Sequence, residues 1–445
     1  MKGIVKGENK NVFRSFVSSF LEEMKTKRVI HSIKVALALV LVSLLYLLNP
    51  LFKQVGENAM WAIMTVVVVF EFYTGATLGK GINRGIGTVL GGGLGCLAAI
   101  LADEIGGIGN HVTVGLSIFI FGAGATYCRT IPRIKRRYDY GAMIFILTFN
   151  LVVVSGIRAE KVVELARDRL ATIGMGFAIC MFISLFIFPI WASDELHYSM
   201  ASRFSKLSTS IQGCLDEYFT ITSEKENKQE IGGAYIQACK AVLNSKSNDE
   251  ALANFAKWEP WHGKFGLNYP WTKYLEIGEY LRDLGVLVLS LQQCIQSPKQ
   301  PTSMQRQKMK EPCEILMISI VFILKELGES TKKMDRCQAK NLLSPNLQSL
   351  KLQFTPQYPS SKIDGTLTSD ENLAIASFNF LLMQIVERVE ILAKKVEELG
   401  ELADFSSTKF ECKCIEKFIP RDGNTRQPPV AAVLATKRSR SCVRP

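Results

Sequence analysis

The segment Ile33–Ile190 decides the fold, because six apolar stretches follow one another within it. It opens with IKVALALVLVSLLYLL at Ile33–Leu48 and closes with LATIGMGFAICMFISLFIFPI at Leu170–Ile190. Between these lie Met60–Phe72, Ile86–Leu101, Val112–Tyr127 and Tyr140–Val154. A helix needs roughly 17–25 apolar residues to cross a hydrocarbon layer of about 30 Å, and each stretch approaches that length, the second by running on through Leu78. The sequence therefore predicts six transmembrane helices.

The charges between these stretches predict the orientation of the chain. Lysines and arginines gather before the first stretch, in the second connection at Lys80 and Arg84, and in the fourth connection at residues 129–137. The third connection instead carries Asp103 and Glu104. Basic residues accumulate on the cytoplasmic side of a membrane. We therefore expect a cytosolic N-terminus, and six spans return the chain to the cytosol.

The composition changes near residue 192, where charged, helix-favouring sequence replaces the apolar stretches. Apolar residues recur there at spacings of three and four, which is typical of amphipathic helices. The predicted helices are Asp194–Phe219, with Asp194 as its cap, Gly232–Leu243, Tyr274–Ile295, Met309–Leu327 and Leu373–Leu402. No strand-rich region competes, so the sequence predicts an all-α membrane protein with a cytosolic bundle of five or six helices.

This reading divides the chain into four parts. Residues 1–30 form a cytosolic N-terminal segment, 31–192 the six-helix transmembrane domain, 193–404 the cytosolic helical domain and 405–445 a basic tail that we expect to be disordered. The tail is either solvated charge, a contact with anionic lipid, or a phosphorylation site.

Several function classes find no support in the sequence. The net charge of +12 lies largely in short loops beside spans, without the aromatic-interleaved stripe that stacks bases, so we expect no nucleic-acid partner. The eleven cysteines lack a paired metal signature, and the four histidines are widely separated, so we expect no metal or other cofactor. Gly75–Lys80 lacks the spacing of a phosphate loop. Gly91–Gly95 instead indicates close helix–helix packing.

Ionisable residues near the spans are the candidate functional groups, because charge is costly in lipid and usually faces a pathway or a partner. Lys34 begins the first span, Arg84 opens the third and Arg169 leads into the sixth. Fixed positive charge favours anions over cations in a pore. Alternatively, end-located cations reach out to head groups, or Arg169 pairs with Glu71 or Glu164. We expect Glu71, within the second span, to be a structural ion-pair partner for one of these cations.

Several long motifs in matching order carry a family resemblance. They include Trp61–Glu71, Gly75–Arg84, Tyr138–Gly141, Phe188–Ala192 and the triplet Trp258, Glu259, Pro260. Together they resemble the plant aluminium-activated malate transporter family over roughly residues 28–405. The resemblance implies a homodimeric anion channel that passes malate and often chloride, nitrate or sulfate. It maps the pore-lining basic residues onto Lys34, Arg84, Lys135, Arg158 and Arg169. The exit of the last span, Phe186–Trp191, resembles a segment linked to inhibition by γ-aminobutyrate.

The sequence thus favours a passive anion channel over an enzyme, since no polar catalytic cluster is evident. Its rivals are a proton-coupled organic-anion carrier that uses Glu71, and a membrane enzyme or scaffold. We expect the plasma membrane, with the vacuolar membrane as the alternative. The first outer connection offers Glu57 beside Lys53, although Glu160 and Glu164 add outer acids. We therefore expect weak or absent activation by external aluminium.

Overall fold

The computed structural model describes residues 26–44, 47, 59–156, 162–219, 228–266, 268–297, 303–337 and 369–406. Within these ranges the regular structure is helical, and the only pairings of extended residues are two isolated bridges. The expected all-α class is therefore confirmed for the described part of the chain. The predicted basic tail beyond residue 406, most of the predicted N-terminal segment and Arg158 lie outside the described residues.

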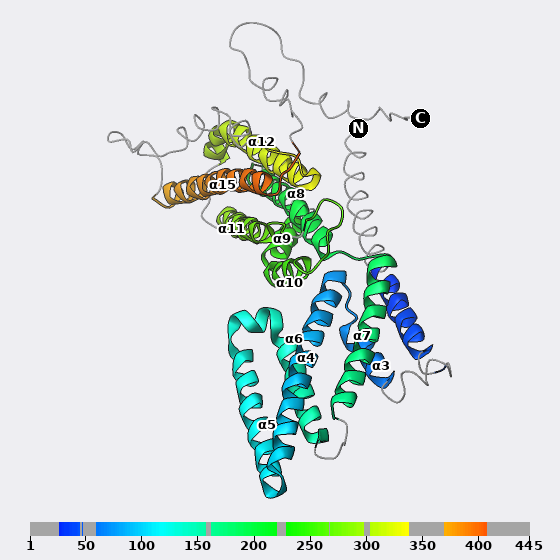
Figure 1. Ribbon diagram of the computed structural model, residues 1–445. Helices are drawn as coiled ribbons and strands as arrows, with labels where there is room; N and C mark the ends of the chain where they lie inside the picture. Colours follow the sequence, from blue (N-terminus) through cyan, green and yellow to red (C-terminus); the bar gives the residue numbers. More distant parts are fainter. Residues whose placement is uncertain are drawn as a thin grey trace, which may run out of the picture. The chain divides into compact units, whose positions relative to one another are not determined.

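The first half of the chain forms the apolar helices expected of a membrane protein. Residues 26–44 are helical, and α3 (Ala59–Val69), α4 (Thr74–Ile105), α5 (Gly107–Thr130), α6 (Pro132–Gly156) and α7 (Val162–Phe186) follow. Four of the described helices have a stretch long and apolar enough to cross a bilayer, in α4, α5, α6 and α7. The helix α3 adds a shorter apolar segment at Met60–Val69. Figure 1 shows α4, α5 and α6 side by side.

The expected course of the second span is wrong. Helix α3 already ends at Val69, and a new helix starts at Thr74, so Lys80 lies inside α4 rather than in a connection. Polar groups stabilise the break between the helices. The backbone N–H of Thr74 donates to the carbonyl of Ile190 (3.0 Å), and the Thr77 hydroxyl accepts from the N–H of Glu71 (3.0 Å). These bonds satisfy backbone groups that a helix end otherwise leaves free.

Glycines bring α4 and α6 close together. A Cβ added at Gly91 would lie 2.7 Å from the carbonyl oxygen of Phe145, and one at Gly95 would lie 3.0 Å from the Cβ of Val152. Gly93, by contrast, faces open space. Small residues allow such close packing between membrane helices, where backbone surfaces meet. The expectation that the glycine run serves helix packing is confirmed at Gly91 and Gly95.

The second half folds into a bundle of helices around α8 (Ala192–Phe219). Its other described helices are α9 (Lys228–Leu243), α10 (Lys246–Ala256), α11 (Trp271–Ile295), α12 (Ser303–Lys333) and α15 (Ser369–Leu402). Apolar residues at spacings of three and four in α8 are at most 1% exposed: Leu196, Met200, Phe204, Leu207, Ile211 and Leu215. The sequence did not predict α10, which is only 11 residues long.

A buried ion cluster connects three helices of this bundle. Asp249 of α10 is fully buried and accepts hydrogen bonds from Arg203 of α8 (2.6 Å) and Arg282 of α11 (3.1 Å). Each guanidinium compensates the buried carboxylate, which on its own would be strongly destabilising. The cluster therefore fixes the position of the short helix α10, which carries the loop described below.

Candidate functional site

Two of the predicted pore cations, Lys34 and Arg84, are almost completely buried in the membrane half, with exposed fractions of 1% and 5%. A third, Arg169, is half-buried. They come from three different helices, and among the described residues none of the three forms an ion pair with a carboxylate. A buried charge without a counter-charge is costly, which makes these three side chains the candidate functional set.

Lys34 lies in the middle of the helix of residues 26–44, and its side chain contacts the chain segment after α7. Its Nζ atom is 3.5 Å from the carbonyl oxygen of Phe188, which is a long contact for a hydrogen bond. Phe188 itself has a positive φ of 45°, an unusual conformation for a non-glycine residue. One turn earlier, the ring of His31 lies 5.9 Å from Phe70 and 5.3 Å from Phe72. The buried ammonium group thus has only this long contact as a hydrogen bond among the described residues.

Arg84 lies in the first half of α4, against α6. Its Nη1 atom donates to the hydroxyl of Tyr140 (3.2 Å), while its buried Nε atom has no hydrogen-bond partner within the described part of the chain. The neighbouring Asn83 donates from its side chain to the carbonyl of Arg137 (3.0 Å), which fixes the register of α4 against α6. A single neutral hydroxyl leaves the guanidinium charge of Arg84 uncompensated.

Arg169 lies near the start of α7, with its guanidinium carbon 5.1 Å from the centre of the Trp61 ring. Its buried Nε and Nη1 atoms have no hydrogen-bond partner among the residues that the structure describes. The aromatic ring attracts the cation but offers no acceptor for these N–H groups. About 25 Å of helix separates Arg169 from the end of α7 at Phe186, the end that leads to Lys34's neighbour Phe188. Free cationic groups therefore lie near both ends of this helix.

The remaining predicted site residues of the membrane half are placed differently. Lys135 is exposed in the first turns of α6. Glu71 lies in the break between α3 and α4 and pairs with Lys80, a cation that the sequence analysis had not considered as its partner. A bidentate ion pair between Arg129 and Asp139 (2.8 and 3.2 Å) closes the α5–α6 connection and was not anticipated.

The triplet Trp258, Glu259 and Pro260 forms a joint at the start of α8. The Glu259 carboxylate accepts hydrogen bonds from the backbone N–H groups of Ala192 (2.6 Å) and Ser193 (3.2 Å). Free N–H groups at a helix N-terminus favour a negative charge. Burial nevertheless raises the pKa of Glu259, while these hydrogen bonds act to lower it. The expected cap, Asp194, instead lies within the first turn of α8.

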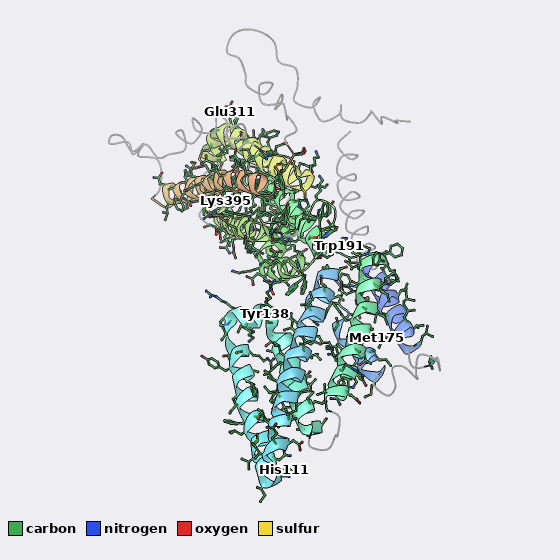
Figure 2. The ribbon with its side chains drawn as sticks, viewed as in Figure 1. His111, Tyr138, Met175, Trp191, Glu311 and Lys395 are labelled. Atoms are coloured by element: carbon green, nitrogen blue, oxygen red, sulfur yellow. The ribbon has the colours of Figure 1, made fainter. Side chains whose placement is uncertain are left out.

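The same triplet contacts the membrane half. The Trp258 ring packs against Gly79 of α4, where an added Cβ would lie only 2.9 Å from the ring. The guanidinium of Arg137 lies 4.6 Å from the centre of the Trp258 ring. Next to it, the ring of His262 stacks on Trp191 at 3.8 Å, and its Nδ1 donates to the carbonyl of Pro260 (2.8 Å). Figure 2 shows Trp191 where the chain leaves α7 for α8.

In the sequence, the triplet stands out only as a motif of the family resemblance, within the predicted cytosolic domain. The sequence offered no signal for the partners in α4 and α6, because these are 120 or more residues away along the chain. An ion pair between Lys27 and Glu195 (3.2 Å) adds a further contact between the first helix and α8.

Comparison with known proteins gives a consistent result. The profile of the family described as aluminium activated malate transporter matches residues 21–353. Aluminum-activated malate transporter 12 of Arabidopsis thaliana is 45% identical over 321 residues, which are 72% of this chain and 57% of that protein. Aluminum-activated malate transporter 2 of the same plant is 41% identical over 387 residues, 86% of this chain and 76% of that protein. Aluminum-activated malate transporter 1 of Triticum aestivum is 34% identical over 397 residues, 86% of this chain and 83% of that protein.

The chain spans 57–60% of the length of aluminum-activated malate transporters 12, 13 and 14 of Arabidopsis thaliana. With the other two relatives the match extends over both the apolar helices and the helical bundle. The profile match and these identities show that the chain belongs to the aluminium-activated malate transporter family.

Proposed function

We propose that the chain is one subunit of a homodimeric, passive anion channel that conducts malate together with chloride, nitrate and sulfate. The observation that carries this proposal is the set of buried cations without carboxylate partners in the described membrane half: Lys34, Arg84 and Arg169. An anion entering a low-dielectric pathway loses hydration, and a fixed cation offsets that loss. Membership in a family named for malate transport supports malate as the permeant ion.

The positions of the cations favour a conduction pathway for anions rather than a single anion-binding site. Lys34 and Arg169 contact opposite ends of the α7 region, so that an anion meets positive charge near each face. Malate carries two negative charges, and each charge that crosses 100 mV gains about 2.3 kcal/mol. An inside-negative membrane therefore drives malate outward by roughly 4–5 kcal/mol per 100 mV, without a nucleotide.

The joint at Trp258, Glu259 and Pro260 supports a gating role for the bundle. Glu259 binds the first N–H groups of α8, while Trp258 contacts α4 and α6. A movement of the bundle is thereby transmitted directly to the helices that carry Arg84 and its partner Tyr140. We place the joint, both chain ends and the bundle on the cytosolic side, and the protein in the plasma membrane.

Voltage-clamp recording from membranes that contain the full chain tests the channel proposal. We expect unitary currents with malate, chloride and nitrate, whose reversal potentials follow the anion gradients and not the proton gradient. A flux without unitary events, which saturates at low turnover and shifts with the proton gradient, would contradict it. Loss of that proton coupling in Glu71→Gln would then favour the proton-coupled carrier.

A further inference from the structure

The loop of residues 257–266, between α10 and α11, holds a tryptophan at the surface. Trp261 is 76% exposed, whereas Trp271 is 3% exposed. The chain's other three tryptophans all lie in ring contacts: Trp61 with Arg169, Trp191 with His262 and Trp258 with Arg137. A large apolar ring with one polar N–H is rarely left in water, and it is favoured where an apolar phase meets a wet one.

The exposure of Trp261 follows from a well-fixed backbone. The next residue, His262, exchanges two backbone hydrogen bonds with Phe265 (3.3 and 3.0 Å), and Gly263 has the positive φ of 52° that this tight turn requires. The His262 ring stacks on Trp191, and Phe265 is buried in the bundle core. Residues on both sides are therefore held inward, and Trp261 is held outward.

The length of α4 bears on the depth at which the loop meets the membrane. This helix has 32 residues and is thus about 48 Å long, while a hydrocarbon core is about 30 Å thick. Its far end carries Asp103 and Glu104, which belong in the opposite head-group layer. The first eight to ten residues of α4 then extend beyond the hydrocarbon on the bundle side. Gly79, which contacts Trp258, and Gly75, which contacts Glu259, lie in that part.

The charges beside Trp261 suit an anionic lipid surface. Lys257 and Lys264 flank the tryptophan and are both exposed. Lys264 donates to the carbonyl of Lys333 (3.1 Å) and forms no ion pair with a carboxylate of the described residues. The neighbouring Glu259 carboxylate is turned inward to α8. An exposed tryptophan between two lysines matches the head-group layer of an anionic leaflet, where both residue types are enriched.

We propose that Trp261 inserts into the head-group layer of the leaflet on the bundle side, with Lys257 and Lys264 bound to anionic lipid head groups. This proposal rests on the spanning assignment of α4 and not on the identity of the transported ion. The loop also carries Glu259, so lipid contact at Trp261 acts on the same rigid segment that caps α8. The lipid composition of that leaflet is thus coupled to the joint between bundle and membrane helices.

Fluorescence quenching of the full chain in lipid nanodiscs tests the insertion. The bilayers contain phosphatidylcholine with one-fifth phosphatidylserine, either unbrominated or brominated near the head-group end of the acyl chain. Subtracting the emission of Trp261→Phe from that of the unmodified chain isolates Trp261. We expect brominated lipid to quench this difference emission at least twofold and aqueous iodide to quench it weakly. Trp271→Phe, which removes a buried ring of the bundle, is the matched control and should leave the lipid-dependent quenching unchanged.

Three results would overturn the proposal. Strong quenching by iodide with no effect of bromine places Trp261 in water. If Trp261 is protected from iodide but not quenched by bromine, and only in discs with two subunits, then a second copy of the chain covers this surface. Equal bromine quenching in bilayers with and without phosphatidylserine removes the role of the lysines. The proposal instead requires quenching that increases with phosphatidylserine and loses that increase in the double variant Lys257→Ala, Lys264→Ala.

Discussion

At the scale of single residues, the cations of the membrane half differ in how fully their charge is compensated. Arg129 has a bidentate carboxylate partner, while Arg169 has a tryptophan face and two buried nitrogen atoms without partners among the described residues. An arginine stays charged at any relevant pH and can bind a carboxylate with two parallel hydrogen bonds. We therefore propose Arg169 as the residue from which a bound anion would gain most.

Arg169→Ala should lower the malate current at least tenfold, which corresponds to about 1.4 kcal/mol. Arg169→Lys should retain part of the current, because the charge remains while the two-pronged geometry is lost. The matched control is Arg167→Ala, since Arg167 is 75% exposed and pairs with the adjacent Asp168. Current and surface abundance are measured together. A parallel loss of both would mean that Arg169 holds helices together and does not serve the pathway.

His197 provides a pH-dependent stability term within the bundle. Its Nε2 lies 3.2 Å from the carbonyl of Lys332, which only accepts, so Nε2 carries the proton and Nδ1 accepts from the Tyr274 hydroxyl (2.8 Å). Burial lowers the pKa of His197 below its ordinary value of 6.5. The hydrogen bond to the Lys332 carbonyl and the charge of Asp194 oppose this lowering, and the charge of Lys264 adds to it. The folded state therefore binds fewer protons than the unfolded state. The contribution of His197 to the stability of the folded state is fully present above about pH 6.5, and it is lost as the pH falls below that value.

The unmodified protein should accordingly lose more thermal stability between pH 7.5 and 5.5 than His197→Gln does. Tm values from intrinsic fluorescence of the detergent-solubilised chain measure this difference. His111→Gln, at an exposed position of α5, is the control and should keep the slope of the unmodified protein. Identical slopes for the unmodified chain and His197→Gln would show that protonation of His197 does not destabilise the bundle.

At the scale of elements, α4 is the helix that the other parts depend on. It packs against α6 through Gly91 and Gly95, and its first turns contact Phe255, Trp258 and Glu259. The helix is continuous from Thr74 to Ile105, so the contact with the bundle and the contact with the membrane helices are parts of one rigid rod. Disturbing either contact therefore has a distinct and testable effect.

Gly91→Ala should lower the Tm of the solubilised chain, because the added methyl group would lie 2.7 Å from the Phe145 carbonyl and force α4 and α6 apart. Overpacking of this kind costs about 1–3 kcal/mol. Gly93→Ala is the matched control on the same helix, since nothing lies within 4 Å of its added methyl group. An equal Tm for both variants would contradict the tight α4–α6 contact.

Glu259→Ala should reduce the maximal current with little change in anion preference, because α8 loses the carboxylate that binds its first two free N–H groups. Loss of such a cap costs about 1 kcal/mol of helix stability. Glu250→Ala, on the exposed side of α10, should leave the current unchanged. A shift in the malate-to-chloride permeability ratio at full current would instead place Glu259 in the permeation path.

At the scale of the whole molecule, the sidedness predicted from the loop charges concerns which helix ends lie beside the bundle. Lys27 pairs with Glu195, Arg137 contacts Trp258, and the start of α4 contacts the 255–259 segment, so these basic helix ends share a side with the bundle. Asp103 and Glu104 lie at the other end of α4. In Figure 2, His111 and Tyr138 mark the opposite ends of the α5–α6 pair.

Cysteines introduced at Gly107 and Lys135 should therefore react with a membrane-impermeant maleimide from opposite faces in intact cells. The background should carry Cys128→Ser, because Cys128 is exposed near Lys135. We expect the Gly107 position to react from outside and the Lys135 position only after permeabilisation. Labelling of both from the same face would exclude the proposed arrangement of α4, α5 and α6.

The sequence by itself determined the all-α class, the apolar helices of the first half and the amphipathic helices of the second. These follow from local patterns, such as the apolar stripe of α8 and the glycine run of α4, because the spacing of apolar residues along a helix indicates which face is buried. It also supplied Lys34, Arg84 and Arg169 as candidate pore residues, because charge beside an apolar stretch is conspicuous. The family resemblance rested on the same local motifs and agrees with the comparisons.

Only the tertiary structure decided where those helices stop and which groups meet. The break at Phe70–Tyr73 depends on bonds to Thr77 and to Ile190, which no local pattern shows. Asp194 has the right residue type for a cap, yet Glu259 binds the N-terminus of α8 from 66 residues further along the chain. Whether a buried cation finds a carboxylate is likewise set by packing between distant helices. Such pairings depend on three-dimensional proximity, whereas periodicity reports only on neighbours three or four residues apart.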